Sequence, residues 1–352
     1  MATPGGQISA NDIRNEFGAT NSDGSVSLGA YRVSHDIGNM GELPLDTGVP
    51  QSGMIKYYDM KNKRLNIVVD FHSGGAVHRQ NAASRYDGGH VTYVGNFYPN
   101  THGNSPPGAG GSNRGAYKSV IIHVNKTIGG DDPGNGHSAN RVALRTGSWH
   151  GDTAMKIDVG SLGRIYGQGG KGGAGNAGEH SGDPGENGTS ALGIEIDATV
   201  HIRNGGYIQA GYGGGGGGGG GYDSDKHDDE LGSGGGGGGG AGYPVGTGGE
   251  GGDGWESDGE DGDNGTTNGA GEGGSGGNSD NEGIGGAGGD GGSPGEAADT
   301  GGEGSGNNGT GEGGAGGGDG AAVRRTSGSI TIHYTGETDR IVGAKGVTGT
   351  IS

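Results

Sequence analysis

The sequence predicts a mainly β and irregular fold: a small N-terminal anchor with a short helix, a β-sandwich-like middle domain, and a C-terminal polyglycine II helix bundle with interleaved β-strands. Two features of the composition predict it. Glycine accounts for 99 of 352 residues and hydrophobic residues for only 26 %, whereas globular chains average about 7 % glycine and about 45–50 % apolar residues. The β-branched and aromatic residues concentrate between 54 and 165 and are almost absent from 211–320. One large hydrophobic core is therefore excluded, and smaller cores are expected where apolar residues gather.

These differences in composition divide the chain into four segments. We expect an anchoring or oligomerisation module at 1–50 and a β-rich domain at 51–160. The glycine-rich bundle would span 161–323, with a β insertion near 192–210, and a β-strand segment would follow at 324–352.

The first segment contains a helix start. Ser9 can cap the helix, Asp12 follows three residues later in the capping-box position, and Ile8 can pack on Ile13. Phe17 continues the apolar face one turn later. A helix this short is not stable alone, so we expect Ile8, Ile13 and Phe17 to anchor it against a partner. An ordinary N-terminal helix of a globular domain is the alternative.

The middle of the chain predicts β-strands. Short runs rich in Val, Ile, Tyr and Phe are each bounded by Gly, Asn, Pro or Asp. These runs are Met54–Asp59, Arg64–Phe71, His90–Tyr98, Lys118–Val124 and Val142–Thr146. Short strands with frequent turns favour a sandwich-like domain. Two β-hairpin-like units, at 154–166 and 193–208, then lead into glycine tracts, and a third at 329–334 closes the chain.

The long glycine tract has a period of three. Glycines recur at every third position in several frames, the longest of which includes Gly283, Gly286, Gly289 and Gly292. Three residues per turn is the geometry of polyproline II, and collagen, its best-known use, needs far more than the 10 prolines present. Polyglycine II remains: extended helices pack side by side through backbone hydrogen bonds, and each packed face requires glycine. We expect these four glycines to pack inside the bundle; a flexible linker is the alternative.

Turn-forming residues interrupt this period, and we interpret them as reversals between antiparallel rods. Aromatic residues at loop tips are common contact residues in recognition. We therefore expect receptor-binding loop tips that include Tyr222, Tyr243, Trp255, Asn268 and Asn281. Covering the end of the bundle is the alternative role of the aromatic residues.

The sequence carries no pattern typical of catalysis, and we expect no enzyme activity, no cofactor and no metal site. The absence of cysteine excludes thiol chemistry and disulfides. The motif Gly167-x-Gly169-x-x-Gly172 matches the glycine spacing of dinucleotide-binding sites, but no helix pattern follows it. An acidic stretch at 223–230 lacks the spacing of an EF-hand, so a solvated turn is favoured over a calcium site.

The formal net charge of −19 argues against nucleic-acid binding, which needs a basic surface. No run of about 18 apolar residues exists, so no membrane insertion is expected. Paired carboxylates such as Glu260 and Asp261 could serve a glycosidase. They lie in segments interpreted as turns, which lack the preorganisation that catalysis needs.

Three regions of the sequence resemble phage proteins. Glycine-rich rods entered from short strands, over roughly 160–325, resemble the receptor-binding tips of T-even-like phage long tail fibres. Residues 8–18 look like a short anchoring motif of tail, baseplate and fibre proteins, especially of marine and cyanobacterial phages, and 118–129 resemble a β-segment of those proteins. The resemblance implies a tail-fibre or tail-tip adhesin, placed in the virion and assembled in the bacterial host cytoplasm.

The resemblance also implies the partners. Residues 1–50 would bind other tail or baseplate proteins or form a homotrimer, and the bundle loops would bind a host glycan or outer-membrane protein. A purely structural baseplate, connector or capsid-decoration protein is the main alternative, and an ice-binding polyglycine II protein or a glycan depolymerase is a lesser one. The receptor, the host, the oligomeric state and the position on the virion are not given by the sequence.

Overall fold

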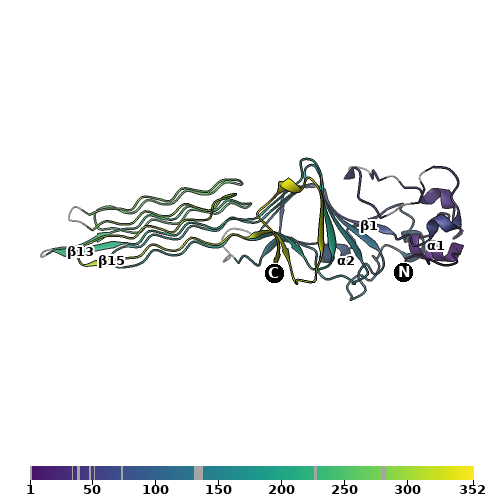
Figure 1. The fold of residues 1–352 in the computed structure, drawn as a ribbon, viewed down its shortest axis with the longest axis horizontal. Helices are drawn as coiled ribbons and strands as arrows, with labels where there is room; N and C mark the ends of the chain where they lie inside the picture. Colours follow the sequence, from purple (N-terminus) through teal and green to yellow (C-terminus); the bar gives the residue numbers. More distant parts are fainter. Residues whose placement is uncertain are drawn as a thin grey trace.

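The molecule is elongated, with short helices at one end, parallel strands in the middle and a bundle of extended segments at the other end (Figure 1). We call these parts the N-terminal cap (residues 2–63), the β-helix and the bundle. The computed structural model describes residues 2–33, 35–37, 40–46, 49–50, 52–72, 74–130, 138–225, 228–279 and 283–352.

The expected mainly β and irregular class is confirmed, because helices are few and short. The α-helices of the described chain are α1 (Ala10–Phe17), α2 (Ala82–Asp87) and α3 (Pro99–His102). Its 3₁₀ turns include η1 (Leu28–Tyr31), η3 (Tyr57–Met60) and η4 (Thr338–Arg340).

The middle of the molecule is a three-sided parallel β-helix. Its strands form one six-stranded and two five-stranded sheets, and each turn of the chain, or rung, contributes one strand to each sheet. The six-stranded sheet contains β1 (Asn66–Phe71), β5 (Ser119–Val124), β8 (Ala154–Val159), β11 (Ala198–Ile202) and β17 (Ile332–Gly336), with β4 (Val91–Tyr93) antiparallel at its edge. The second sheet contains β2 (Val77–His78), β6 (Thr127–Gly129), β9 (Arg164–Tyr166), β12 (Tyr207–Gln209) and β18 (Ile341–Val342). The third contains β3 (Gln80–Asn81), β7 (Val142–Arg145), β10 (Ser190–Ile194), β16 (Ala321–Arg325) and β19 (Ala344–Thr348).

The parallel pairing corrects the sandwich-like arrangement expected for the middle domain. Sandwich sheets are antiparallel, whereas strand β5 pairs in parallel with both β1 and β8. Apolar runs separated by turn residues occur both in antiparallel hairpins and at the corners of a β-helix. The sequence pattern therefore could not distinguish these two folds. The strands near 192–210 and after 324 are later rungs of the same β-helix. Residues 54–59, expected as a strand, instead enter the 3₁₀ turn η3.

Stacked aliphatic side chains form the core of the β-helix. Ile128, Ile165, Ile208 and Ile341 occupy equivalent positions in successive rungs of the second sheet, and each is less than 5 % exposed. Because parallel strands in register place like residues directly above one another, a short repeated motif is enough to build a continuous apolar column.

The N-terminal helix forms as expected. Ser9 accepts a hydrogen bond from the backbone of Asp12, and the Asp12 carboxylate accepts the Ser9 N–H in return. One turn further on, the buried carboxylate of Glu16 accepts the backbone N–H of Leu65 (2.6 Å) and pairs with the buried Lys118 ammonium. Burial raises the pKa of Glu16, although the pairing with Lys118 opposes this. The helix thereby docks beside the starts of β1 and β5, which are neighbours in the six-stranded sheet.

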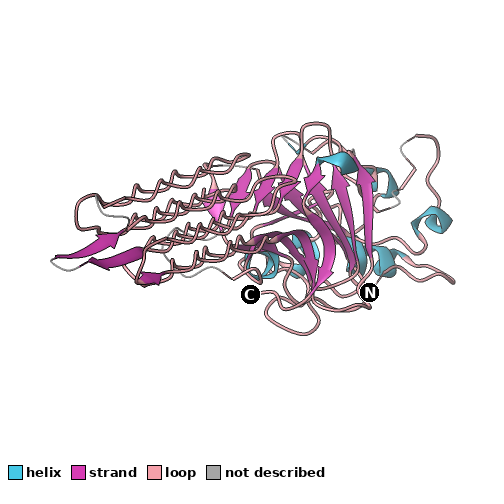
Figure 2. Ribbon diagram, turned by 60° about the vertical axis from the view of Figure 1, so that its left-hand side comes forward, coloured by secondary structure: helices cyan, strands magenta, loops and turns pink. Residues whose placement is uncertain are grey.

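The bundle is built from two insertions at one corner of the β-helix. Residues 167–189 leave between β9 and β10, and residues 210–320 leave between β12 and β16, so both join the second sheet to the third. Figure 2 shows the extended segments running side by side away from the sheets. The rods are 167–176, 182–189, 211–220, 234–241, 246–254, 259–265, 271–277, 283–292, 299–305 and 311–320.

Hydrogen bonds between the rods repeat every three residues. Gly215 and Gly218 donate to the carbonyl oxygens of Gly238 and Gly235, each at 2.8 Å. A three-residue repeat on both partners matches the three residues per turn of the polyproline II geometry. The described residues of 211–320 contain no α-helix, and the ordered polyglycine II bundle is therefore supported over a linker.

The number of neighbours explains which rods are pure glycine. Rod 211–220 donates backbone hydrogen bonds to three rods and accepts them from three others. It donates to 182–189, 234–241 and 299–305, and accepts from 167–176, 283–292 and 311–320. All its faces are packed, so residues 213–220 are all glycine. Rod 259–265, at the bundle surface, keeps glycine only at every third position.

Asp and Asn side chains complete the bundle surface. Rods at the edge have backbone N–H groups that face no further rod, and a carboxylate or amide oxygen accepts them instead. Examples are Gly248 to Asn264 (2.9 Å), Gly251 to Asp261 (2.8 Å) and Gly273 to Asp290 (2.8 Å). These side chains therefore satisfy donors of the backbone.

Candidate functional site

The loops at the far end of the bundle gather into one surface, which we call the distal tip. It comprises residues 177–181, the strands β13 (Gly221–Asp225), β14 (Asp228–Gly232) and β15 (Gly309–Thr310), residues 254–258, Ser279 with Gly283 and Ile284, and residues 305–308. Figure 1 places β13 and β15 at the end opposite the helices. Ser233, which follows β14, forms β-bridges with Ala177 and with Gly277 at the end of rod 271–277, and so joins three chain segments beside the tip.

A small antiparallel sheet holds the centre of the tip. Strand β13 pairs with β14 and β15. The side chain of Asp223 is 3 % exposed and accepts hydrogen bonds from the amides of Asn307 (3.0 Å) and Asn308 (3.2 Å). The loop at 305–308 is thus fixed to the hairpin.

Two large apolar side chains are exposed on the distal tip. Trp255 is 68 % exposed and Ile284 is 46 % exposed. The Trp255 backbone N–H donates to Leu231 of β14 (3.2 Å), which seats its loop against the hairpin. Acidic residues Asp253 and Glu256 flank the indole in the sequence. An apolar ring with acidic neighbours suits a partner that offers apolar and basic or hydroxyl groups.

The predicted loop-tip residues divide between the two ends of the bundle. Tyr222, in β13, and Trp255 lie at the distal tip. Asn281 lies outside the described residues. Tyr243 and Asn268 lie at the opposite end, beside the β-helix, so they do not share the tip surface. Successive reversals of antiparallel rods alternate between the two ends, and the turn residues do not encode which end they occupy.

Tyr243 instead fastens the bundle to the β-helix. Its ring stacks on His78 at 5.7 Å between centroids, and its carbonyl oxygen accepts the N–H of Gly130 (2.9 Å). The turn that contains Asn268 is held in a similar way, because the amide of Gln209 in β12 donates to Thr267 (2.7 Å). These two turns form the junction between bundle and β-helix.

Ile284 is the residue that sequence reasoning missed at the tip. It is the only large apolar residue in the glycine-rich stretch from 259 to 320. A lone large side chain where every neighbour is small or polar was the signal that could have marked it.

The expected anchoring side chains face the interior of this chain. Ile13 is 0 % exposed and packs with Tyr31, Val49 and Met60. Phe17 packs on the Tyr31 ring at 5.5 Å, and Ile8 packs against the same cluster. The side chain of Ile13 is thus covered by its own chain, while the anchoring role of Ile8, Ile13 and Phe17 stays a prediction.

The bundle glycines lie where close packing was expected. A methyl group on Gly286 would lie 2.1 Å from the carbonyl oxygen of Gly302, and one on Gly289 would lie 2.4 Å from that of Asp299. Gly283 and Gly292 are also buried, although the nearest atom to a methyl group on Gly292 would be 3.1 Å away.

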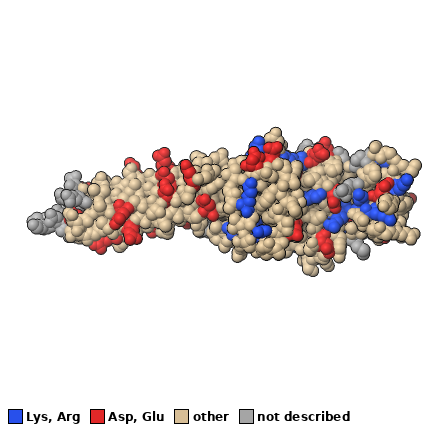
Figure 3. Space-filling model, in the orientation of Figure 1, with Lys and Arg blue, Asp and Glu red and all other residues tan. Residues whose placement is uncertain are grey.

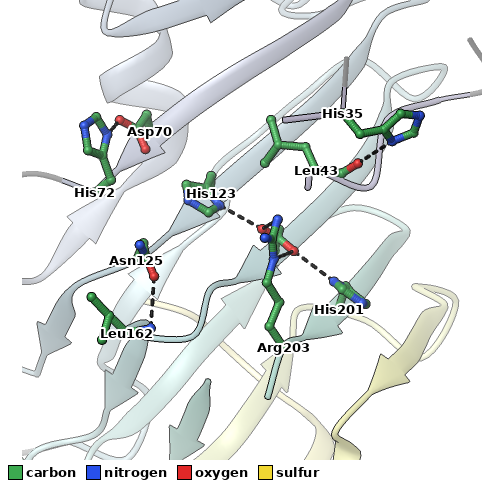
Figure 4. A network of polar contacts seen from close by, with 10 residues as sticks. His35, Leu43, Asp70, His72, His123, Asn125, Leu162, His201 and Arg203 are labelled. Carbon is green, nitrogen blue, oxygen red and sulfur yellow. Dashed lines mark hydrogen bonds and ion pairs between the residues drawn. The ribbon is translucent and has the colours of Figure 1, made fainter. Parts of the chain in front are cut away.

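A separate polar network crosses the outer face of the six-stranded sheet. Figure 4 shows His123, His201 and Arg203 pointing toward one carboxylate, that of the fully buried Asp158. Asp158 accepts from His123 (2.7 Å), His201 (2.9 Å) and both Nε (3.0 Å) and Nη2 (2.7 Å) of Arg203. Burial alone would raise the pKa of Asp158, but the hydrogen bonds from His123, Arg203 and His201 outweigh it and lower the pKa. The network ties three successive rungs together.

The described side chains contain no group of three or more His, Asp or Glu residues that could hold a metal ion. In the same part of the chain, no helix has both the length and the apolar character required to cross a bilayer. Asp261, one of the paired carboxylates, accepts the N–H of Gly251 and so takes part in the bundle surface.

Comparison with known proteins gives the family. A family model described as phage tail fibre adhesin Gp38 matches residues 100–346. The chain belongs to the Gp38 family of phage tail fibre adhesins. The Gp38 match includes the whole bundle and most of the β-helix but not the N-terminal cap. It confirms the resemblance to phage tail-fibre adhesins and places the protein in the virion tail.

Two further comparisons accompany the Gp38 match. The solved gp37–gp38 adhesin tip complex of the bacteriophage S16 long tail fiber is similar over 67 % of this chain and 71 % of that chain, with 19 % sequence identity and a TM-score of 0.27. No curated protein matches the sequence.

Proposed function

We propose that this Gp38-family protein recognises the bacterial host through its distal tip, without catalysis. The observation that carries the proposal is the gathering of separate loops into one ordered surface that exposes Trp255 and Ile284. Exposed aromatic and aliphatic side chains on a fixed scaffold contribute binding energy at a low entropic cost. The bundle beneath them acts as a rigid spacer.

The cell-surface partner in this proposal is a glycan or an outer-membrane protein. Both offer groups that contact an indole ring, and the acidic residues near Trp255 favour basic or hydroxyl-bearing partners over phosphate-rich ones. Protease treatment and periodate oxidation of the host cells distinguish the two sources. Loss of binding after protease alone indicates a protein.

Competition with the phage tests the proposal. Purified full-length protein should bind cells of the strain that propagates the phage and should reduce phage adsorption. Trp255→Ala, alone and combined with Ile284→Ala, should weaken this competition at least about tenfold, because hot-spot truncations cost about 2 kcal/mol or more. Both side chains are exposed, so folding is not at risk.

The matched control is Asn268→Ala, which changes an exposed turn at the opposite end of the bundle and should compete like the wild type. Tyr117→Ala removes a 42 % exposed aromatic side chain from the β-helix region and should also be silent. If the wild-type protein neither binds cells nor competes, a purely structural role in the tail replaces this proposal.

A further inference from the structure

A hollow lies where the N-terminal cap meets the outer face of the six-stranded sheet. We call it the side pocket. It is open to solvent and has a volume of about 450 Å³, within the range of about 300–1,000 Å³ that is usual for small-ligand pockets. Its lining comes from the cap (His35, Glu42, Leu43 and Pro44) and from the end of β11 (His201 and Arg203).

The cap side of the side pocket has a fixed backbone. The Leu43 N–H donates to the carbonyl oxygen of His35 (2.8 Å), and Nδ1 of the His35 ring lies 2.8 Å from the carbonyl oxygen of Leu43. The Leu43 side chain is buried in one cluster with Ile121 of β5. The loop that carries Glu42 and Pro44 is thereby held against the β-helix.

Asp158 fixes the opposite wall of the side pocket. Its buried carboxylate accepts hydrogen bonds from Nδ1 of His201 (2.9 Å) and from Nε (3.0 Å) and Nη2 (2.7 Å) of Arg203 (Figure 4). Among the described residues, Nε2 of His201 and Nη1 of Arg203 have no hydrogen-bond partner. Both groups are therefore held in place and remain available to a ligand.

The hydrogen bonds at Nδ1 determine the histidine tautomers. Carboxylates and backbone carbonyl groups only accept hydrogen bonds. Nδ1 therefore carries the proton in His201, which faces Asp158, and in His35, which faces a carbonyl oxygen. In a neutral imidazole the other nitrogen, Nε2, then presents a lone pair. With the carboxylate of Glu42, the side pocket offers three acceptors and one donor group, Nη1 of Arg203.

This combination favours a ligand that carries hydroxyl groups. Glu42 and Arg203 bring opposite charges to one pocket, so a simple anion would meet the carboxylate and a simple cation the guanidinium. A sugar hydroxyl both donates and accepts, and it therefore satisfies either group. Pro44 adds apolar surface for the C–H groups of a sugar ring. Figure 3 shows charges of both signs over the β-helix and the cap, whereas acidic side chains mark the bundle.

We infer that the side pocket binds one unit of a neutral saccharide. Glu42 and the two histidines accept hydrogen bonds from its hydroxyl groups, and Arg203 donates to one of its oxygen atoms. The inference goes beyond the proposed receptor role, because the side pocket shares no residue with the distal tip. Gp38 family membership does not assign it either, since the match begins at residue 100 and omits His35 and Glu42.

A metal ion is the competing occupant, because histidine and carboxylate side chains are common zinc ligands. In the part of the chain that the structure describes, however, no three His, Asp or Glu side chains are grouped so that they could hold a metal ion. Arg203 also lines the side pocket, and its positive charge opposes a cation there. A saccharide meets neither objection.

Titration of the full-length chain with sugars tests the inference. Glucose, galactose, mannose and N-acetylglucosamine are added separately to isotope-labelled protein, and the imidazole signals of His35 and His201 are followed by NMR. At least one of the four sugars should shift both signals in a saturable way. In the free protein, both neutral rings should carry the proton on Nδ1.

Two variants remove acceptors from the side pocket. Glu42→Ala truncates an exposed side chain. His201→Phe keeps a ring but removes Nε2, and His123 and Arg203 still donate to Asp158. Each variant should weaken the affinity for the bound sugar at least about fivefold, because one net hydrogen bond contributes about this much. The His35 signal reports binding in both.

Matched controls carry the same substitutions outside the side pocket. His333→Phe changes an exposed histidine on β17, the next strand of the same sheet, and Glu337→Ala truncates an exposed glutamate just after that strand. Both should bind the sugar like the wild type. Trp255→Ala, at the distal tip, should also bind it like the wild type. All variants should keep a cooperative unfolding transition.

Four results would overturn the inference. The first is the absence of a saturable shift with all four sugars. The second is wild-type affinity in both Glu42→Ala and His201→Phe, and the third is an equal loss in the two controls. The fourth is a saturable shift of both histidine signals with zinc chloride but with no sugar, which would assign the side pocket to a metal ion. Normal phage competition by Trp255→Ala would instead contradict the proposed receptor role alone.

Discussion

Glycine has a position-specific role in the bundle, which follows from what a single methyl group would meet. Gly217 belongs to a rod with packed faces all around, and a methyl group there would lie 1.9 Å from the carbonyl oxygen of Ala174. Ala287, on a surface rod, is exposed to solvent. The more rods surround a position, the smaller the side chain that it tolerates. The crowded axis of collagen requires glycine for the same reason.

Gly217→Val and Gly286→Val should strongly destabilise the protein. The added side chain must push a neighbouring rod away, and each broken hydrogen bond leaves buried polar groups that cost about 1–3 kcal/mol. Ala287→Val, one residue along from Gly286 but facing solvent, should change the unfolding temperature little. Thermal unfolding of the three variants measures this. Similar shifts for all three would mean that the period of three has no packing meaning.

Asp158 should make stability depend on pH in the acid range. Its pKa in the folded protein lies below the ordinary value of 3.8. Its stabilising contribution is therefore fully present above about pH 4 and is lost as pH falls through the folded-state pKa. Asp158→Ala leaves Arg203 without its buried partner and should cost about 3–5 kcal/mol at neutral pH.

Unfolding temperatures measured from pH 7 to pH 2 check the role of Asp158. The wild type should lose more stability below pH 4 than Asp158→Ala does. Asp152→Asn, a change at an exposed carboxylate beside His150, is the control and should follow the wild-type profile. An Asp158→Ala profile parallel to that of the wild type would show that this carboxylate does not govern acid stability.

Among the elements, those with local causes were predictable from the sequence. Helix α1 was expected because Ser9 and Asp12 cap each other within four residues. The bundle was expected because its requirement for glycine repeats with the period of the backbone itself. Several strands, among them β5 and β7, fall on their expected runs because β-branched residues gather there.

The relations between elements were not predictable, because they depend on contacts distant in sequence. Nothing in the sequences around Ile165 and Ile208 shows whether their strands, β9 and β12, run parallel, although the two residues stack in register. The turns at Tyr243 and Trp255 use similar residues and lie at opposite ends of the bundle. The 3₁₀ turn at Tyr58 could not be distinguished from a strand by its composition alone. The sequence thus predicted that loop tips of the bundle form a surface, but which residues belong to that surface could be seen only in the structure.

The parts of the whole molecule follow one another along its long axis. The cap lies at one end and the distal tip at the other, with the β-helix and the bundle between them (Figure 1). Both bundle insertions leave from the same corner of the β-helix. In the next rung, Gly343 alone joins β18 to β19 at this corner, with φ at +111°. One residue is therefore enough to connect the second sheet to the third.

This geometry predicts that the bundle can be removed without unfolding the β-helix. Gln209 pairs with Val342, and Ala321 pairs with Ala344, so a single glycine can connect Gln209 to Ala321 as Gly343 connects the next rung. The same register permits a single glycine between Tyr166 and Ser190. A chain in which 167–189 and 210–320 are each replaced by one glycine keeps every rung of the apolar core. It should unfold cooperatively and retain β-sheet circular dichroism.

The shortened chain should also lose receptor binding. It lacks the distal tip and should neither bind host cells nor compete with phage adsorption. Cell binding is measured side by side with the full-length chain. A shortened chain that still binds cells would move the receptor site to the β-helix or the cap. A shortened chain that fails to fold would show that the rods support the sheets as well as the tip. The rungs on either side of the insertions would then need the bundle to hold their register.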